Sequence, residues 1–269
     1  MSNRHGFRII GLMLCIGPAL AQIESQNPSV NLIPNPGAEE IMPGKDFPPP
    51  QTDFVKQRVC YLNPGALVPG HWGAFAPRYG GGVGLWGATD KEAHSGSNSA
   101  YLTFTGFEKW TDNWKPPVPT VNMTLFTGAP NGYEGATAIS VQPNTDYTFS
   151  FWFKGNVPAV AVKINGWNSE TGAYNTVESL PISHPRKNGI GIRDHHYTRG
   201  GATILMNSLF PSSTWTYYSG SFRTGPNIRR VALGFAIENT RLLQPDQAIY
   251  VDDVTLSPAS TMPDTGKKP

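Results

Sequence analysis

Short segments in which large apolar residues alternate with small or polar ones constrain the fold of this chain most strongly. In residues 147–154 the aromatic side chains recur at every second position, so that Phe149 and Phe151 share one face and Trp152 lies on the other. Further segments with the same period of two are 160–164, 215–222, 231–238 and 249–256. No long stretch has the period of a helix. The pattern predicts half-buried antiparallel strands, each with one face in a core.

Composition and length favour a single all-β domain. The 269 residues include 29 glycines and 25 prolines but only 15% charged residues, which suits short strands joined by turns. Without internal repeats or long linkers, the simplest organisation is one antiparallel β-sandwich over residues 31–257, after a polar lead-in at 22–30 and before a disordered tail at 258–269. Four side chains are expected to face the core between its two sheets: Phe149, Phe151, Leu233 and Phe235.

Residues 1–21 have the features of a secretory signal peptide. Arg4 and Arg8 precede the apolar run 9–17, and small residues flank a cleavage site at Ala21. The apolar run is short for a bilayer span, and no later segment is apolar enough to cross a membrane. We therefore expect a secreted or periplasmic protein, cleaved near Ala21.

Cleavage also changes the charge and the cysteine content. It removes Arg4 and Arg8 and no acidic residue, so the formal net charge falls from +2 to 0. A neutral protein lacks the electrostatic footprint of a nucleic-acid binder. Cys60 would be the sole remaining cysteine, so no internal disulfide is expected.

Short motifs occur in a characteristic order along the chain. Acidic motifs stand at both ends of the expected domain, in residues 31–40 (NLIPNPGAEE) and 249–256 (IYVDDVTL). Between them lie PGHW at 69–72, HSGSNSAYL at 94–102, PNTDYTFSFWFKG at 143–155 and TWTYYSGSF at 214–222. Together these segments resemble the CenC-like carbohydrate-binding modules, which are jelly-roll sandwiches of the galactose-binding-like plan. The resemblance spans nearly the whole mature domain and implies binding of polysaccharide; the loops before His94 and after Glu178 are longer than usual.

The same resemblance implies a structural calcium ion at a distance from the glycan. Its ligands map to the acidic turn after the first strand, the loop of the HSG motif and the last strand, which contain Glu39, Ser95, Asn98 and Asp252. Calcium takes about six to eight oxygen ligands from carboxylates and carbonyls. Because adjacent residues of a strand point to opposite faces, only one of Asp252 and Asp253 is expected to be a ligand.

Aromatic side chains are the candidates for sugar contact, because the apolar faces of pyranose rings stack on aromatic rings. Trp152 shares its face with Thr148, Ser150 and Lys154, whose polar groups can pair with hydroxyls. The alternative is that a loop or the second sheet covers Trp152. Further candidates stand in Gly-, Asn- or Pro-rich contexts typical of exposed loops: Trp86, Trp110, Trp114 and Trp167. Some of these are expected to anchor loops to the core instead of contacting sugar.

The sequence contains no recognisable catalytic motif, and we assign no catalytic residue. There is no GxSxG, no P-loop and no dinucleotide fingerprint, and no spacing singles out a pair of carboxylates. Arg193-Asp194-His195-His196 lacks the spacing of a zinc site and is interpreted as a solvated loop. The main hypothesis is a non-catalytic polysaccharide-binding protein. The alternatives are an adhesive or matrix protein that binds protein partners, and a polysaccharide hydrolase or lyase whose cleft is built from the long loops 41–70 and 178–203.

Overall fold

The computed structural model describes the following parts of the chain: residues 30–46, 59–77, 82–107, 121–127, 138–167, 202–240 and 243–259. Their regular structure is β-strand throughout, apart from one turn of 3-10 helix, η1 (Gly44–Asp46). Within these ranges, no helix has the length and apolarity needed to span a membrane. The prediction of an all-β fold is confirmed.

The first large sheet contains six strands in the order β13-β10-β15-β7-β6-β3. Neighbouring strands are antiparallel, except that the short β3 runs parallel to β6. The bounds are β3 (Asn63–Pro64), β6 (Gly82–Thr89), β7 (Ser99–Phe107), β10 (Asp146–Gly155), β13 (Thr216–Arg223) and β15 (Ala248–Pro258).

The second large sheet contains seven strands. Six of them follow the order β12-β11-β14-β8-β5-β2, and β9 pairs separately with β14. All these pairs are antiparallel. The bounds are β2 (Val59–Tyr61), β5 (Trp72–Pro77), β8 (Val121–Thr127), β9 (Ile139–Ser140), β11 (Val160–Trp167), β12 (Ala202–Leu209) and β14 (Arg230–Thr240).

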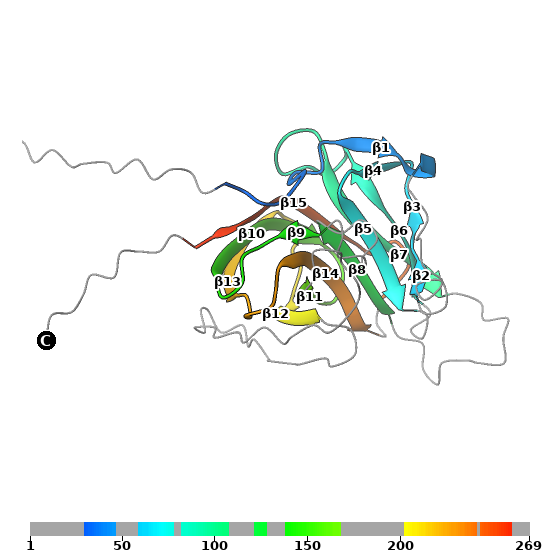
Figure 1. The fold of residues 1–269 in the computed structure, drawn as a ribbon. Helices are drawn as coiled ribbons and strands as arrows, with labels where there is room; N and C mark the ends of the chain where they lie inside the picture. Colours follow the sequence, from blue (N-terminus) through cyan, green and yellow to red (C-terminus); the bar gives the residue numbers. More distant parts are fainter. Residues whose placement is uncertain are drawn as a thin grey trace, which may run out of the picture.

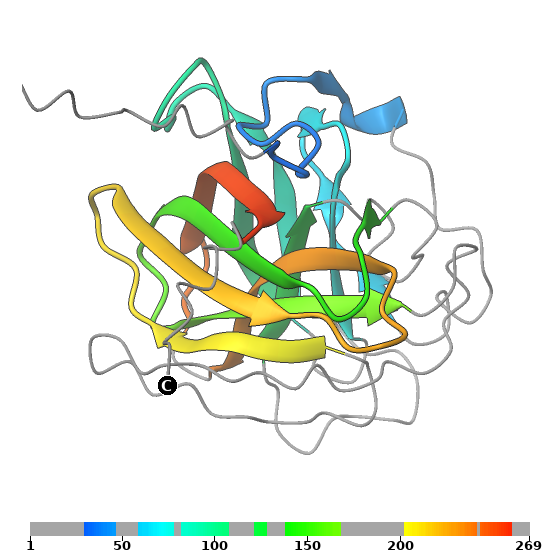
Figure 2. The same cartoon turned by 60° about the vertical axis from the view of Figure 1, so that its left-hand side comes forward.

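The two sheets pack face to face as a β-sandwich, as Figures 1 and 2 show. A separate ribbon of β1 (Ile41–Pro43) and β4 (Leu67–Pro69) lies at the end of the sandwich away from β12. Residues 41–70, which carry few strand signals in the sequence, thus contribute four short strands, β1 to β4. Each has only two or three residues, too few for a period of two to be visible.

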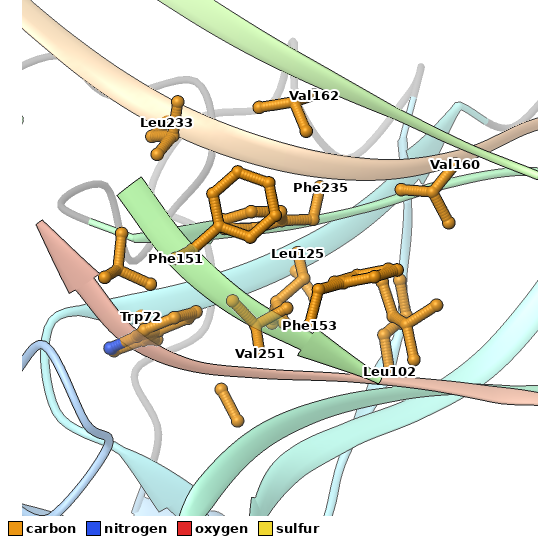
Figure 3. Packing of buried hydrophobic residues seen from close by; sticks show 14 of the residues in the cluster. Trp72, Leu102, Leu125, Phe151, Phe153, Val160, Val162, Leu233, Phe235 and Val251 are labelled. Atoms are coloured by element: carbon orange, nitrogen blue, oxygen red, sulfur yellow. The ribbon is translucent and has the colours of Figure 1, made fainter. Parts of the chain in front are cut away.

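A single hydrophobic core fills the space between the sheets (Figure 3). The aromatic residues of β10 meet β14 there: the Phe151 and Phe235 rings are 4.9 Å apart, in an edge-to-face arrangement that aromatic pairs favour. The predicted core positions Phe149, Phe151, Leu233 and Phe235 all belong to this cluster, and none is more than 2% exposed. The face assignment made from the alternating pattern is therefore confirmed for both strands.

The first described residues are hydrogen-bonded to the last strand. Leu32 N–H donates to the carbonyl of Leu256 at 2.7 Å, and the Asn31 side chain donates to the carbonyl of Val254 at 3.0 Å and accepts from Leu256 N–H at 2.9 Å. Further along, Val254 N–H donates to the carbonyl of Pro36 at 3.0 Å. The acidic motifs of the two chain ends therefore lie side by side.

Candidate functional site

The outer face of the six-stranded sheet carries a group of aromatic side chains. Trp152 of β10 projects away from the core and is half-buried. Its cross-strand neighbour on β13 is Tyr217, which is 54% exposed, and their ring centres are 5.5 Å apart. Residues paired across an antiparallel sheet hold their side chains on one face, so these two rings form one continuous surface.

A histidine from the loop between β6 and β7 completes this group. The His94 imidazole stacks on the Trp152 indole with ring centres 3.7 Å apart and planes inclined by 16°. Trp215, just before β13, meets His94 edge-on at 5.8 Å. We call His94, Trp152, Trp215 and Tyr217 the aromatic cluster. The alternative that a loop covers Trp152 holds in part, because a loop residue lies on one face of the indole without burying the side chain fully. The role of Trp152 in sugar contact stays a prediction.

Hydroxyl groups extend along the same outer face, beside the aromatic cluster. Ser150 of β10 pairs with Thr255 of β15 at 2.6 Å between their hydroxyl oxygens, and Thr148 pairs with Ser257 at 3.2 Å. Lys154, at the other side of Trp152, forms an ion pair with Glu92. Aromatic rings next to hydroxyl pairs provide apolar and hydrogen-bonding contacts on one surface.

Two adjacent aspartates of β15 anchor the loop that bears His94. Asp252 Oδ2 accepts from the backbone N–H groups of His94, at 2.8 Å, and of Ser95, at 3.2 Å. Asp253 Oδ2 accepts from His94 Nδ1 at 2.7 Å, and its Oδ1 accepts from the Ser95 hydroxyl at 2.6 Å. Both carboxylates therefore contact the same short segment.

The expectation that Asp252 and Asp253 lie on opposite faces is wrong, because β15 contains a bulge. The register with β10 passes from Ser150–Thr255 to Trp152–Asp252, so the bulged strand has one residue more than its partner. Asp253 has a positive φ of 48°. The extra residue breaks the regular alternation and directs both carboxylates toward the loop.

Glu39 holds the other end of this loop. Its Oε1 accepts from the backbone N–H groups of Ser97, at 2.9 Å, and of Asn98, at 3.1 Å, and its Oε2 accepts from the Asn98 side chain at 3.2 Å. Burial acts to raise the pKa of the Glu39 carboxyl, but the hydrogen bonds from Asn98 and Ser97 outweigh it and lower the pKa below its ordinary value. Gly96 lies against Glu39 with φ of 62°, and a Cβ there would collide with the carboxylate. Glycine is the residue that fits both constraints.

We call Glu39, Asp252 and Asp253 the carboxylate cluster, and its chemistry is compatible with a hard cation. Asp252 is fully buried, and burial raises the pKa of its carboxyl to about 6 while hydrogen bonds from His94, Ser95 and Asp253 offset part of the effect. Gly37 lets the backbone approach both aspartates closely: a Cβ on it would lie 3.3 Å from Asp252 Oδ1, tighter than an ordinary contact, and 3.8 Å from Asp253 Oδ1.

The carboxylates do not make a metal site by themselves. Among the described residues, no group of three or more His, Cys, Asp or Glu side chains is arranged to hold a metal ion. A calcium ion here would therefore take carboxylate oxygens together with hydroxyl, amide or carbonyl oxygens, a mixed set that calcium accepts. Ser95 and Asn98 already lie against the cluster through their hydrogen bonds to Asp253 and Glu39.

Two of the other predicted tryptophans are buried, so the expectation that they lie in exposed loops is wrong. Trp86 is 1% exposed because, in β6, it points into the core. Trp167 is 3% exposed and ends β11, in the other sheet from Trp152. Trp110, Trp114 and the Arg193–His196 motif lie outside the described residues. The structure therefore joins neither Trp86 nor Trp167 to the aromatic cluster.

Sequence reasoning missed Tyr217 and the ring of His94 as members of this site. For Tyr217 a signal exists, because the alternation in residues 215–222 places Trp215 and Tyr217 on the face opposite Phe222. For His94 no periodic signal exists, because its position depends on the hydrogen bonds of an irregular loop to Asp252 and Asp253.

No family model and no curated protein sequence matches this chain significantly. Comparison with solved structures finds chains with a similar arrangement of strands. One is the enzymatically active domain of tailspike protein 4 of bacteriophage CBA120, at 15% identity and a TM-score of 0.40, covering 71% of this chain. This chain spans only 20% of that tailspike chain.

Carbohydrate-binding modules are also among these structures. TmCBM61 in complex with β-1,4-galactotriose is 10% identical with a TM-score of 0.39, and the match covers 86% of this chain and all of that one. The CBM22-1–GH10 modules of Clostridium thermocellum xylanase 10B, complexed with xylohexaose, are 12% identical with a TM-score of 0.38, covering 70% of this chain and 26% of that one. TM-scores this low transfer neither a ligand nor a binding surface to this chain.

Proposed function

We propose that this protein is a secreted or periplasmic, non-catalytic β-sandwich that binds polysaccharide through Trp152 and Tyr217 of its aromatic cluster. The observation that supports this function is the pairing of Trp152 with the exposed Tyr217 on the outer face of the six-stranded sheet, next to hydroxyl pairs. The order of the sequence motifs, with their resemblance to CenC-like modules, points to the same class of ligand. Export follows from the signal peptide expected in residues 1–21.

The chemistry of a pyranose suits this surface. Its axial C–H groups make an apolar face that packs on an indole or phenol ring, and its equatorial hydroxyls need hydrogen-bonding partners at the ring edge. Tyr217 offers an exposed ring, and Ser150 and Thr255 offer hydroxyls a short distance along the sheet.

The test is the affinity of Trp152→Ala and Tyr217→Ala proteins for soluble xylan and β-glucan oligosaccharides, measured by isothermal titration beside a thermal melt. By analogy with the stacking of bases on aromatic rings, each change is expected to weaken binding by about 1–3 kcal/mol. Phe107→Ala is the matched control, because Phe107 is 43% exposed at the far end of β7 and takes no part in the aromatic cluster. Wild-type affinity in folded Trp152→Ala and Tyr217→Ala proteins would contradict the proposal.

We also propose that a structural calcium ion binds at the carboxylate cluster, with Glu39 and Asp252 as carboxylate ligands and Ser95 and Asn98 supplying further oxygens. The convergence of the three carboxylates on one loop and the burial of Asp252 support this assignment. A carboxylate accepts about four hydrogen bonds or ligands, so the N–H groups that it already binds leave oxygen lone pairs for a cation. Such an ion would tie the first described segment to the last strand.

A further inference from the structure

His94 connects the carboxylate cluster with the aromatic cluster. Its backbone N–H is held by Asp252, and its ring nitrogen Nδ1 is held by Asp253 at 2.7 Å. The same ring lies flat on Trp152 at 3.7 Å. One side chain thus contacts the acidic group on β15 through its edge and the indole on β10 through its face.

The connection is short because of the sheet register. Asp252 stands directly opposite Trp152 in the pairing of β10 with β15, and the bulge places Asp253 next to it. Ser95 donates its hydroxyl to Asp253 Oδ1, so Asp253 holds two consecutive loop residues. A carboxylate can only accept hydrogen bonds, so His94 Nδ1 is the donor and the plane of the imidazole is fixed by this contact.

We infer that His94 is a positioning residue: Asp253 orients its imidazole, and the imidazole holds the Trp152 indole in the conformation that binds sugar. This inference rests on the proposed function of Trp152. It differs from the expectation that the acidic site is remote from the glycan, because only one side chain separates the two clusters.

The physical reason is preorganisation. A ligand that immobilises a side chain on binding loses affinity by the free energy of that ordering, and a ring that is already stacked avoids this loss. His94 covers one face of the indole and restricts its rotation about the side-chain torsions, while Tyr217 flanks it on the neighbouring strand. Removing the stack should therefore weaken sugar binding without removing any group that touches the sugar.

The experiment compares the affinity of four variants for the oligosaccharide that binds the wild type. His94→Gln removes the ring, and Asp253→Asn removes one acceptor while tolerating the positive φ at this position. His94→Phe keeps a ring that can stack on Trp152. Asp90→Asn is the control, because Asp90 is an exposed aspartate in the same loop.

We expect His94→Gln and Asp253→Asn to weaken binding by roughly threefold to tenfold, the range that ordering one side chain represents. His94→Phe should retain most of the wild-type affinity, and Asp90→Asn should bind as the wild type does. The losses of binding free energy in these two variants should not be additive, because both act through the imidazole. Asp253→Asn should therefore have little further effect on affinity in the His94→Gln protein.

A spectroscopic measurement separates positioning from a general loss of structure. The indole N–H resonance of Trp152, assigned by its absence in Trp152→Phe, should move in His94→Gln and Asp253→Asn proteins because the imidazole no longer lies over the indole. Thermal melts establish that each variant is folded.

The outcomes distinguish this inference from the proposed function. If Trp152→Ala weakens binding while His94→Gln and Asp253→Asn bind as the wild type does, His94 is not a positioning residue and the proposed function stands. If Trp152→Ala itself binds as the wild type does, the inference is wrong, and if Tyr217→Ala also binds as the wild type does, the proposed function is wrong with it.

Discussion

At the scale of single residues, the backbone of Asp253 decides how the site is assembled. Its φ of 48° belongs to the left-handed region, which Asp and Asn adopt more readily than other non-glycine residues. With this conformation, Asp252 and Asp253 both reach the loop at His94 and Ser95. The sequence pattern of two aspartates in a strand does not contain this information.

Removal of calcium tests the role proposed for Asp252. A chelator should lower the melting temperature of the wild type, because an ion that binds only the folded state contributes about 2.7 kcal/mol at one hundred times its dissociation constant. For a domain of this size that is a shift of about 5–10 °C. Asp252→Ala should abolish the response, and Asp90→Ala should retain it.

Identical melting curves of metal-stripped protein with and without added calcium would contradict the calcium site. A response that survives Asp252→Ala but disappears in Asp253→Ala would transfer the ligand role to the second aspartate. The structure gives both carboxylates an oxygen near Gly37, so the two variants are measured together.

At the scale of single elements, β10 shows how far the sequence pattern reaches. The period of two correctly separates Phe149 and Phe151, which are buried, from Thr148 and Ser150, which face outward. The period of two predicts these faces correctly because β10 is a regular strand that is paired with β13 on one side and with β15 on the other.

The sequence pattern fails in two situations: where a residue lies in an irregular loop, and where a residue is assigned from the types of its neighbours instead of from a period of two. Glycine-rich surroundings predict an exposed loop for Trp86, yet residues 82–89 form the strand β6, in which the indole is buried. The stacking of His94 on Trp152 joins residues far apart in sequence, through a loop whose conformation no period describes. The outward position of Trp152 was therefore predictable, but its neighbours His94 and Tyr217 were not identified.

Phe151 tests the assignment of faces in β10. It is fully buried against Phe235, so Phe151→Ala should lower the free energy of unfolding by about 3–5 kcal/mol in a denaturant titration. Phe107→Ala removes the same atoms from a side chain that is 43% exposed. This variant should change the free energy of unfolding by less than about 1 kcal/mol. A loss below about 1 kcal/mol for Phe151→Ala would be incompatible with the core described here.

At the scale of the whole molecule, the chain passes repeatedly between the two sheets. β10, β13 and β15 belong to the six-stranded sheet, whereas β11, β12 and β14 belong to the seven-stranded sheet. Residues that lie close together in the sequence are thus distributed over two layers, and the aromatic cluster gathers residues from three separate regions of the chain. Spacing in the sequence therefore could not reveal this cluster as a unit.

Lys163 of β11 makes the stability of the molecule depend on pH. Burial lowers the pKa of its ammonium group to about 8, whereas in the unfolded chain it is about 10.4. Between these values the unfolded state binds more protons, so the free energy of unfolding should rise as the pH increases from about 8 to about 9.5. We expect an increase of roughly 1–2 kcal/mol after allowance for solvent screening.

Lys163→Met should remove this dependence and raise stability most at pH 7 to 8, where the folded wild type must keep a charged lysine. The pH range stops short of 10 because burial raises the pKa of Tyr101 and Tyr250, whose ionisation would destabilise the fold above that value. Equal pH slopes for the wild type and Lys163→Met, in denaturant titrations, would show that Lys163 is not the group responsible.

The hydrogen bonds between the first described residues and β15 have a mechanical consequence. Asn31 and Leu32 bond to Leu256, and Pro36 bonds to Val254, so the two segments run in opposite directions and the first and last described residues lie at the same end of this pairing. Tension applied to the two ends would break these bonds one after another, as a zipper opens, rather than load them together. The residues behind them include Gly37 and then Glu39, a member of the carboxylate cluster. A pulled molecule would therefore lose its acidic site while the core between the sheets was still intact.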